Sequence, residues 1–176
     1  GDIESLPFLE ALRQIRVEEG SENVIFVHVT LAPSLEVVGE QKTKPTQHSV
    51  QELRRIGIQP DLLCVRCSMP LQDKTRNKIS MFTNVTNNDV LSCHDVDSIF
   101  QVPEILYEQG LVDVIFKKFN KIGYVNASQN WDTWNKIVNS LQNEGPPINI
   151  AMVGKYVTLA DSYVSVNHAL KHAAAV

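Results

Sequence analysis

The pattern of apolar and polar positions predicts an alternation of helices and strands in the first part of the chain. Apolar side chains recur every three or four residues between Ser5 and about Glu19, which indicates an amphipathic helix. The β-branched, apolar run at 23–31 is typical of a strand buried on both faces. Helical spacing returns from about Thr46 to Ile56, Gly57 is the expected left-handed cap, and a second buried strand follows at 60–66. Strand, helix and strand in this order predict a βαβ unit and a parallel sheet.

The rest of the chain continues the alternation and then becomes less regular. The spacing predicts helices at 73–82, 102–110, 111–119, 131–141 and 161–175, and strands at 89–93 and 148–154. Two prolines after a glycine at 145–147 mark a boundary. We therefore expect an α/β domain at 1–119, a linker with one helix at 120–146, and the opening strand and helix of a second α/β domain at 147–176. Because the chain begins with Gly1, we also expect a piece of a longer protein.

Composition and charge limit the possible partners. The 176 residues are 43% hydrophobic and carry a formal net charge of −4, so the chain is globular and has no basic field for nucleic acid. No apolar run is long enough for a membrane helix, and no signal-peptide pattern is present. The odd, low number of cysteines fits a reducing compartment, so we expect a cytoplasmic protein.

Metal binding is not favoured by the cysteines and histidines. Cys64 and Cys67 form a C-x-x-C, but Cys64 lies in an apolar strand and no second ligand pair accompanies it, so buried strand filler is the better interpretation. His28, in the middle of a strand, is expected to be a satisfied core histidine. His168 and His172 share a helix face but lack the glutamate of an H-E-x-x-H motif, and no metal site is predicted there.

The candidate chemistry centres on the loop Lys42-Thr43-Lys44-Pro45-Thr46-Gln47, between a predicted strand and a predicted helix. In an extended loop the two lysines project to the same side. Thr46 can cap the following helix, whose free N–H groups favour an anion. A polyphosphate site is one interpretation, and an ordinary charged surface loop is the other. Arg66, at the carboxyl end of its strand, has either a binding role or a surface ion pair, whereas helical Lys78 by itself predicts only a solvated charge.

Four segments together resemble the CTP synthase family, in the correct order and over almost the whole chain. They are Gly-Asp-Ile-Glu-Ser-Leu-Pro-Phe (1–8), Gly-Glu-Gln-Lys-Thr-Lys-Pro-Thr-Gln-His-Ser-Val (39–50), His-Asp-Val-Asp-Ser-Ile (94–99) and Val-Gly-Lys-Tyr (153–156). The resemblance implies a P-loop-type amidoligase domain that uses MgATP to phosphorylate the 4-oxygen of UTP, followed by a class I glutamine amidotransferase domain. Ammonia from glutamine then displaces the phosphate and gives CTP.

The resemblance also implies roles for particular residues. Those expected to bind UTP as substrate, or CTP as feedback inhibitor, are Asp2, Ile3, Glu4, Lys42, Thr43, Lys44, Pro45, Thr46, Gln47 and Lys78. Those expected at the ATP adenine are Arg66, His94, Asp95 and Val96, with the backbone of His94 more important than its imidazole. Phe82 lies one turn after Lys78 and is a further candidate for packing on the nucleotide.

The remaining expectations from the resemblance concern parts outside this chain. The P-loop and the carboxylates for Mg²⁺ are expected before Gly1 and the glutaminase nucleophile after Val176, so no catalytic residue is assigned and the chain alone is expected to be inactive. Expected partners are GTP as activator of the glutaminase and further copies in a homotetramer or filament, with residues 5–19 partly an oligomer surface. The alternatives are a non-catalytic fragment that senses CTP or forms filaments, and another amidoligase similar to dethiobiotin synthetase.

Overall fold

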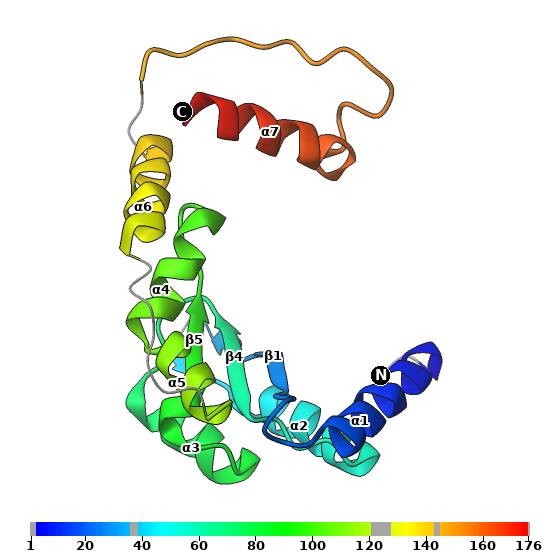
Figure 1. Cartoon of the computed structure of the whole chain (residues 1–176). Helices are drawn as coiled ribbons and strands as arrows, with labels where there is room; N and C mark the ends of the chain where they lie inside the picture. The colour runs from blue at the N-terminus through cyan, green and yellow to red at the C-terminus, as the bar shows by residue number, and fades with distance from the viewer. Residues whose placement is uncertain (1–2, 36–38, 121–127, 143–144, 176) are drawn as a thin grey trace. The chain divides into compact units, whose positions relative to one another are not determined.

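The computed structural model describes residues 3–35, 39–120, 128–142 and 145–175, and the chain divides into two compact units. We call Gly1–Tyr124 the N-terminal unit and Val125–Val176 the C-terminal unit (Figure 1). Among the described residues, no helix is both long and apolar enough to cross a membrane.

A three-stranded parallel sheet forms the centre of the N-terminal unit, in the order β1 (Val27–Leu31), β4 (Leu62–Cys67) and β5 (Val90–His94). In its register Val29 lies opposite Cys64, and Cys64 lies opposite Leu91. Helix α2 (Lys44–Ile56) connects β1 to β4, which confirms the predicted βαβ unit and parallel sheet. The long loop before α2 also holds a short antiparallel pair, β2 (Ser34–Leu35) and β3 (Glu40–Gln41).

The predicted helices are present to within a few residues. The other helical elements are η1 (Ile3–Ser5), α1 (Leu6–Glu19), α3 (Asp73–Thr83), η2 (Asn87–Asp89), η3 (Ile99–Gln101), α4 (Val102–Glu108), α5 (Leu111–Lys118), α6 (Ser128–Gln142), η4 (Ala160–Tyr163) and α7 (Val164–Ala174). Gly57 ends α2 with φ of 93°, in the left-handed region, as the sequence predicts.

Helices cover the sheet on both faces, which is the arrangement expected for parallel strands. On one face α2 and α3 contribute Val50 and Ile79 to a core with Leu63, Val65 and Val90. On the other face, side chains of α4 and α5 pack on Leu62, Cys64 and Leu91; these are Leu106, Leu111 and Val114, joined by Ile25. The predicted α/β class with a parallel sheet flanked by helices is therefore confirmed.

Strand β1 departs from the prediction that it is buried on both faces. It lies at an edge of the described sheet, and Val27, Val29 and Leu31 on one of its faces are 44–64% exposed. Thr30, on the other face, is buried under α2. The continuous apolar run predicts a strand correctly, but burial of its second face needs a covering element, and within the described residues none covers Val29.

His28 is a satisfied, half-buried histidine, as predicted. Its Nε2 lies 2.8 Å from Ser49 Oγ of α2. Burial lowers the pKa of His28 below its ordinary value of 6.5 because the charged imidazolium is desolvated.

This lowered pKa predicts a loss of stability in acid. Below about pH 6.5 the unfolded chain binds the His28 proton more readily than the folded chain, so the free energy of unfolding decreases as pH falls through the folded pKa. Urea unfolding at pH 7.5 and 5.5 should show a smaller decrease in His28→Gln than in the wild type. An equal decrease in both proteins would contradict the assignment.

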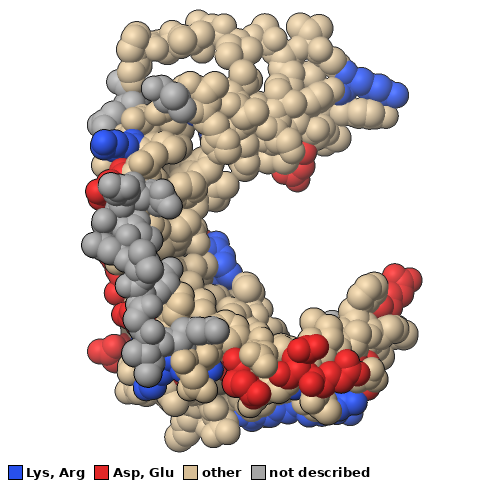
Figure 2. All heavy atoms as spheres, in the orientation of Figure 1, with Lys and Arg blue, Asp and Glu red and all other residues tan. Residues whose placement is uncertain are grey.

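On the face drawn in Figure 2, acidic side chains of the N-terminal unit gather in one band, and basic side chains lie along its lower edge. An ion pair anchors the first helix: Arg16, near the end of α1, lies 2.5 Å from Asp61, immediately before β4. It anchors the last turn of α1 to the edge of the sheet where β4 begins. In Figure 1 the rest of α1 projects away from the sheet, and the N-terminus lies at its far end.

The C-terminal unit consists of α6, η4 and α7 with a segment between them, and α6 contacts α7. The strand predicted at 148–154 is not formed: this segment has no strand assignment, and Ile148 and Val153 are 85% and 94% exposed. A strand needs a hydrogen-bonded neighbour, and the described residues of this unit provide none. The predicted helices at its two ends are present.

Candidate functional site

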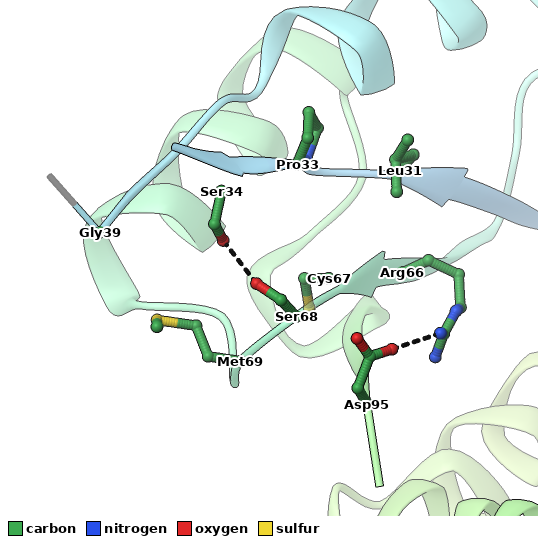
Figure 3. Close-up of a pocket in the computed structure, with 9 residues that line it drawn as sticks. All are labelled: Leu31, Pro33, Ser34, Gly39, Arg66, Cys67, Ser68, Met69 and Asp95. Carbon is green, nitrogen blue, oxygen red and sulfur yellow. Dashed lines mark hydrogen bonds and ion pairs between the residues drawn. The ribbon is translucent and has the colours of Figure 1, made fainter. Parts of the chain in front are cut away.

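A pocket of about 550 Å³ opens where β1 and β4 end, close to the end of β5 (Figure 3). Open α/β sheets usually bind ligands at the carboxyl ends of their strands, and this volume is in the range of small-molecule sites. Its lining comprises Leu31, Pro33, Ser34, Gly39, Arg66, Cys67, Ser68, Met69 and Asp95. The lining therefore combines an apolar wall with hydroxyl groups, one cation and one anion.

Arg66 and Asp95 face each other in this pocket. Arg66 Nη2 lies 2.5 Å from Asp95 Oδ1, and Nη1 donates to the carbonyl of Cys93 at 2.8 Å. The backbone N–H of Asp95 also donates to the carbonyl of Cys67, which holds Asp95 beside the end of β4. Both side chains are exposed, so the pair contributes only about 0–1 kcal/mol and exchanges easily with a ligand. Arg66 therefore forms the surface ion pair that was one of its two predicted roles. Because this pair is weak, the guanidinium can also bind a ligand.

His94 and Val96 follow on β5 and just beyond it, and both are half-buried. His94 Nδ1 lies 3.2 Å from the hydroxyl of buried Ser92. The four residues predicted for the adenine therefore lie together at the ends of β4 and β5, and Arg66 and Asp95 line the pocket itself.

The Lys42–Gln47 segment has a different local structure from the predicted one. Helix α2 begins at Lys44, with Thr43 at the N-cap position and Pro45 in the first turn, because proline favours the first helical positions. Thr46 is therefore inside the helix and does not cap it. Its hydroxyl is fully buried and donates to the Leu31 carbonyl at 2.9 Å, so it anchors the helix to the end of β1. The prediction that Lys42 and Lys44 share an extended loop is also wrong, since Lys44 is helical.

Three lysines act on one carboxylate beside this segment. Lys42 Nζ lies 2.7 Å from Glu40 Oε2, and this hydrogen bond is the main reason why the pKa of Glu40 lies below its usual value. Lys74 and Lys78 of α3 lower the same pKa through their charges. Lys42, directly after β3, and Lys74 and Lys78 on α3 therefore all place positive charge near Glu40, although they belong to different elements. This concentration of cations is suited to a polyphosphate.

The structure does not bring every predicted residue to this place. Ile3 and Glu4 form η1 at the far end of α1, and Asp2 lies outside the described residues. The last turn of α1 is anchored beside Asp61, where β4 begins, whereas the pocket lies where β4 ends. A 14-residue helix adds about 20 Å between that anchor and Ile3. Within one chain, Ile3 and Glu4 are therefore separate from the lysines.

The described residues do not form a metal centre. Among them, no group of three or more His, Cys, Asp or Glu side chains could hold an ion. Cys64 and Cys67 are free, buried strand residues, which confirms the filler interpretation, and burial raises the pKa of both thiols. The carboxylates for Mg²⁺ are expected outside this chain, and we derive no step through that ion.

Sequence reasoning missed several residues of the site. Glu40 and Gln41 lie in the segment that carries the resemblance, but the sequence gives no role to either residue. Ser34, Ser68 and Met69 line the pocket without any local signal beyond their position after a strand. Their importance comes from contacts with residues that are far away in sequence.

Residues 1–121 match the family model described as the CTP synthase N-terminus. The chain is also 51% identical over 172 residues to "CTP synthase" of Thermococcus kodakarensis, which covers 98% of this chain and 32% of the relative. Similar proteins include "CTP synthase" of Saccharolobus solfataricus, at 51% identity over 99% of this chain and 32% of the relative, and of a Cyanothece species, at 49% over 99% and 31%. The chain therefore spans about a third of the length of these relatives.

Proposed function

The chain belongs to the CTP synthase family, and on this premise we propose that it contributes the nucleotide pockets for the ATP-dependent amination of UTP to CTP. In this reaction ATP phosphorylates the 4-oxygen of UTP, and ammonia from glutamine displaces the phosphate. The observation that carries the proposal is the position of Lys42, paired with Glu40, and of the positive charge of Lys78 on α3 near the same carboxylate, beside the pocket with Arg66 and Asp95.

The lysines are proposed to bind the triphosphate of UTP or CTP. A nucleoside triphosphate carries about four negative charges, and charge-assisted N–H···O bonds are roughly twice as strong as neutral ones. Lys42 and Lys78 supply ammonium groups from two elements, while the first turn of α2, with Lys44, Pro45 and Gln47, adds the positive end of a helix dipole. Thr43 and Thr46, both buried, support this turn.

The ends of β4 and β5 are proposed to bind the adenine of ATP. Asp95 accepts from the exocyclic amine, Arg66 stacks beside the ring, and the backbone around His94 and Val96 completes the edge. Asp2, Ile3 and Glu4 are proposed to contribute to a pyrimidine pocket of another copy, since η1 lies apart from the lysines of its own chain.

The partners proposed from family membership are UTP, ATP with Mg²⁺, CTP as inhibitor, and glutamine and GTP at a glutaminase domain. We also propose a homotetramer that can stack into filaments. Support comes from α1, where Phe8 and Val17 are each 73% exposed and no described residue is buried. The three free cysteines support a cytoplasmic location.

Competition between CTP and UTP tests the proposal. The whole protein, purified at its natural length, should form CTP from UTP, ATP and glutamine, and added CTP should raise the UTP concentration needed for half-maximal rate. Calorimetry should give one CTP site per chain, which UTP blocks. Binding without synthesis would favour the CTP-sensing alternative, and absence of both binding and synthesis would overturn the proposal.

A further inference from the structure

The side chain of Gln41, the last residue of β3, connects the loop at residues 68–72 to the segment that carries Lys42. It is buried, and its Nε2 donates to the carbonyls of Met69 and Pro70 at 3.1 and 3.0 Å. Its Oε1 accepts from the backbone N–H of Gln72 at 3.0 Å. Both amide protons and the oxygen have partners of the correct type, so these contacts define the orientation of the amide.

This loop, residues 68–72, joins the two halves of the candidate site. It leaves β4 directly after Arg66 and Cys67, and Met69 lines the pocket. It ends where α3 begins at Asp73, and α3 carries Lys78. On its other side the backbone N–H of Leu71 donates to Ser92 Oγ of β5 at 3.0 Å, so the loop is held between β3 and β5.

Gln41 is also directly connected to Lys42. The backbone N–H of Lys42 donates to the carbonyl of Pro33 at 2.8 Å, which fixes this residue beside the pocket wall. Lys42 and Lys78 therefore lie on separate elements, and the Gln41 amide is a hydrogen-bonded link between them. Two ammonium groups bind one triphosphate well only when their separation is held in the correct geometry.

We propose that Gln41 is a positioning residue, which fixes the start of α3, and hence Lys78, relative to Lys42. This inference rests on the proposed binding of UTP or CTP by the two lysines. Without the amide, two carbonyls and one N–H at the loop lose their partners, and the loop moves toward other donors and acceptors. Because Val50 and Ile79 still hold α3 in the core beside α2, we expect the start of α3 to move while the helix remains packed on the sheet.

A double-mutant cycle in the whole protein tests this role. Gln41→Met keeps the size of the side chain and removes its hydrogen bonds, and we expect it to weaken CTP binding about five- to tenfold. Lys78→Ala should cost clearly less affinity in the Gln41→Met background than in the wild type, since Lys78 is no longer well placed. The matched control is Gln51→Met, at an exposed glutamine of α2, which should leave CTP affinity unchanged.

A purely structural role predicts a different result. If Gln41 only stabilises the fold, thermal unfolding shifts but the two substitutions have additive effects on CTP affinity, and this outcome would overturn the inference. Should Gln41→Met not fold, Gln41→Asn, which is too short for all three contacts, takes its place in the cycle. If the wild type binds neither CTP nor UTP, the proposed function itself fails. If the wild type binds CTP and the effects of Lys78→Ala and Gln41→Met on affinity are additive, only the role of Gln41 fails.

Discussion

Replacing Lys42 with alanine is expected to weaken UTP and CTP binding together, each by about 1.5–3 kcal/mol, or roughly 10- to 150-fold. The loss is that of a hydrogen bond between an ammonium group and a phosphate oxygen. Before binding, Lys42 pairs with Glu40 at 2.7 Å, and both side chains are substantially exposed. An exposed pair of this kind contributes about 0–1 kcal/mol, so the lysine exchanges it for phosphate at little cost.

Two further variants determine whether the effect is specific to this contact. Lys74→Ala removes a nearby lysine that is not among the residues proposed to contact the nucleotide. We expect affinity to change less than about threefold, because a charge that makes no contact with the phosphates is screened by salt. Glu40→Gln removes the competing anion and should tighten both nucleotides by about two- to fivefold. Calorimetric titration at one ionic strength measures all three. Unchanged affinity for both nucleotides in Lys42→Ala would place the triphosphate elsewhere.

Much of the fold follows from local patterns in the sequence. The periodicity predicts the helices and the parallel βαβ unit because a helix and a buried strand each require a particular repeat of apolar positions. The predictions of strands and of their burial are wrong where they depend on a neighbouring element that is distant in sequence. The run at 148–154 has strand composition but no neighbouring strand, and Val29 lies on a sheet face without a covering helix among the described residues.

The candidate site also contains residues that the sequence predicts and residues whose position depends on distant contacts. The charged types and their position make Lys42 and Arg66 candidates, the resemblance to the family adds Asp95, and the structure brings Arg66 and Asp95 into contact. The sequence misplaces the start of α2 because Thr46 resembles a cap. The helix instead begins at Lys44, with Pro45 in its first turn, and the buried hydroxyl of Thr46 donates to the carbonyl of Leu31 at the end of β1.

The contribution of Gln41 has no local signature at all. Its three partners lie at residues 69–72, and only the folding of that loop against β3 gives the amide a function. Residue types therefore indicate where ligand chemistry is possible, while the geometry that holds those groups depends on contacts that sequence spacing does not contain.

The largest stability effect is expected at Asp61, where three segments of the N-terminal unit meet. Its carboxylate accepts from the Arg16 guanidinium at 2.5 and 3.0 Å and from the backbone N–H of Phe26 at 2.7 Å. The Asp61 N–H in turn donates to the Phe26 carbonyl, and the Arg16 guanidinium lies 5.0 Å from the centre of the Phe26 ring. The side chains of Arg16 and Asp61 are 25% and 18% exposed, so water replaces these contacts only in part.

Asp61→Ala should therefore lower the free energy of unfolding by about 2–3 kcal/mol, since it leaves a partly buried guanidinium and a backbone N–H without their acceptor. Asp61→Asn keeps one acceptor for Phe26 and should lose about half as much. Glu52→Ala breaks an exposed pair with Arg55 and should change stability by less than about 0.5 kcal/mol. Urea unfolding compares the three variants. A loss no larger than that of Glu52→Ala would show that α1 is not anchored through this carboxylate.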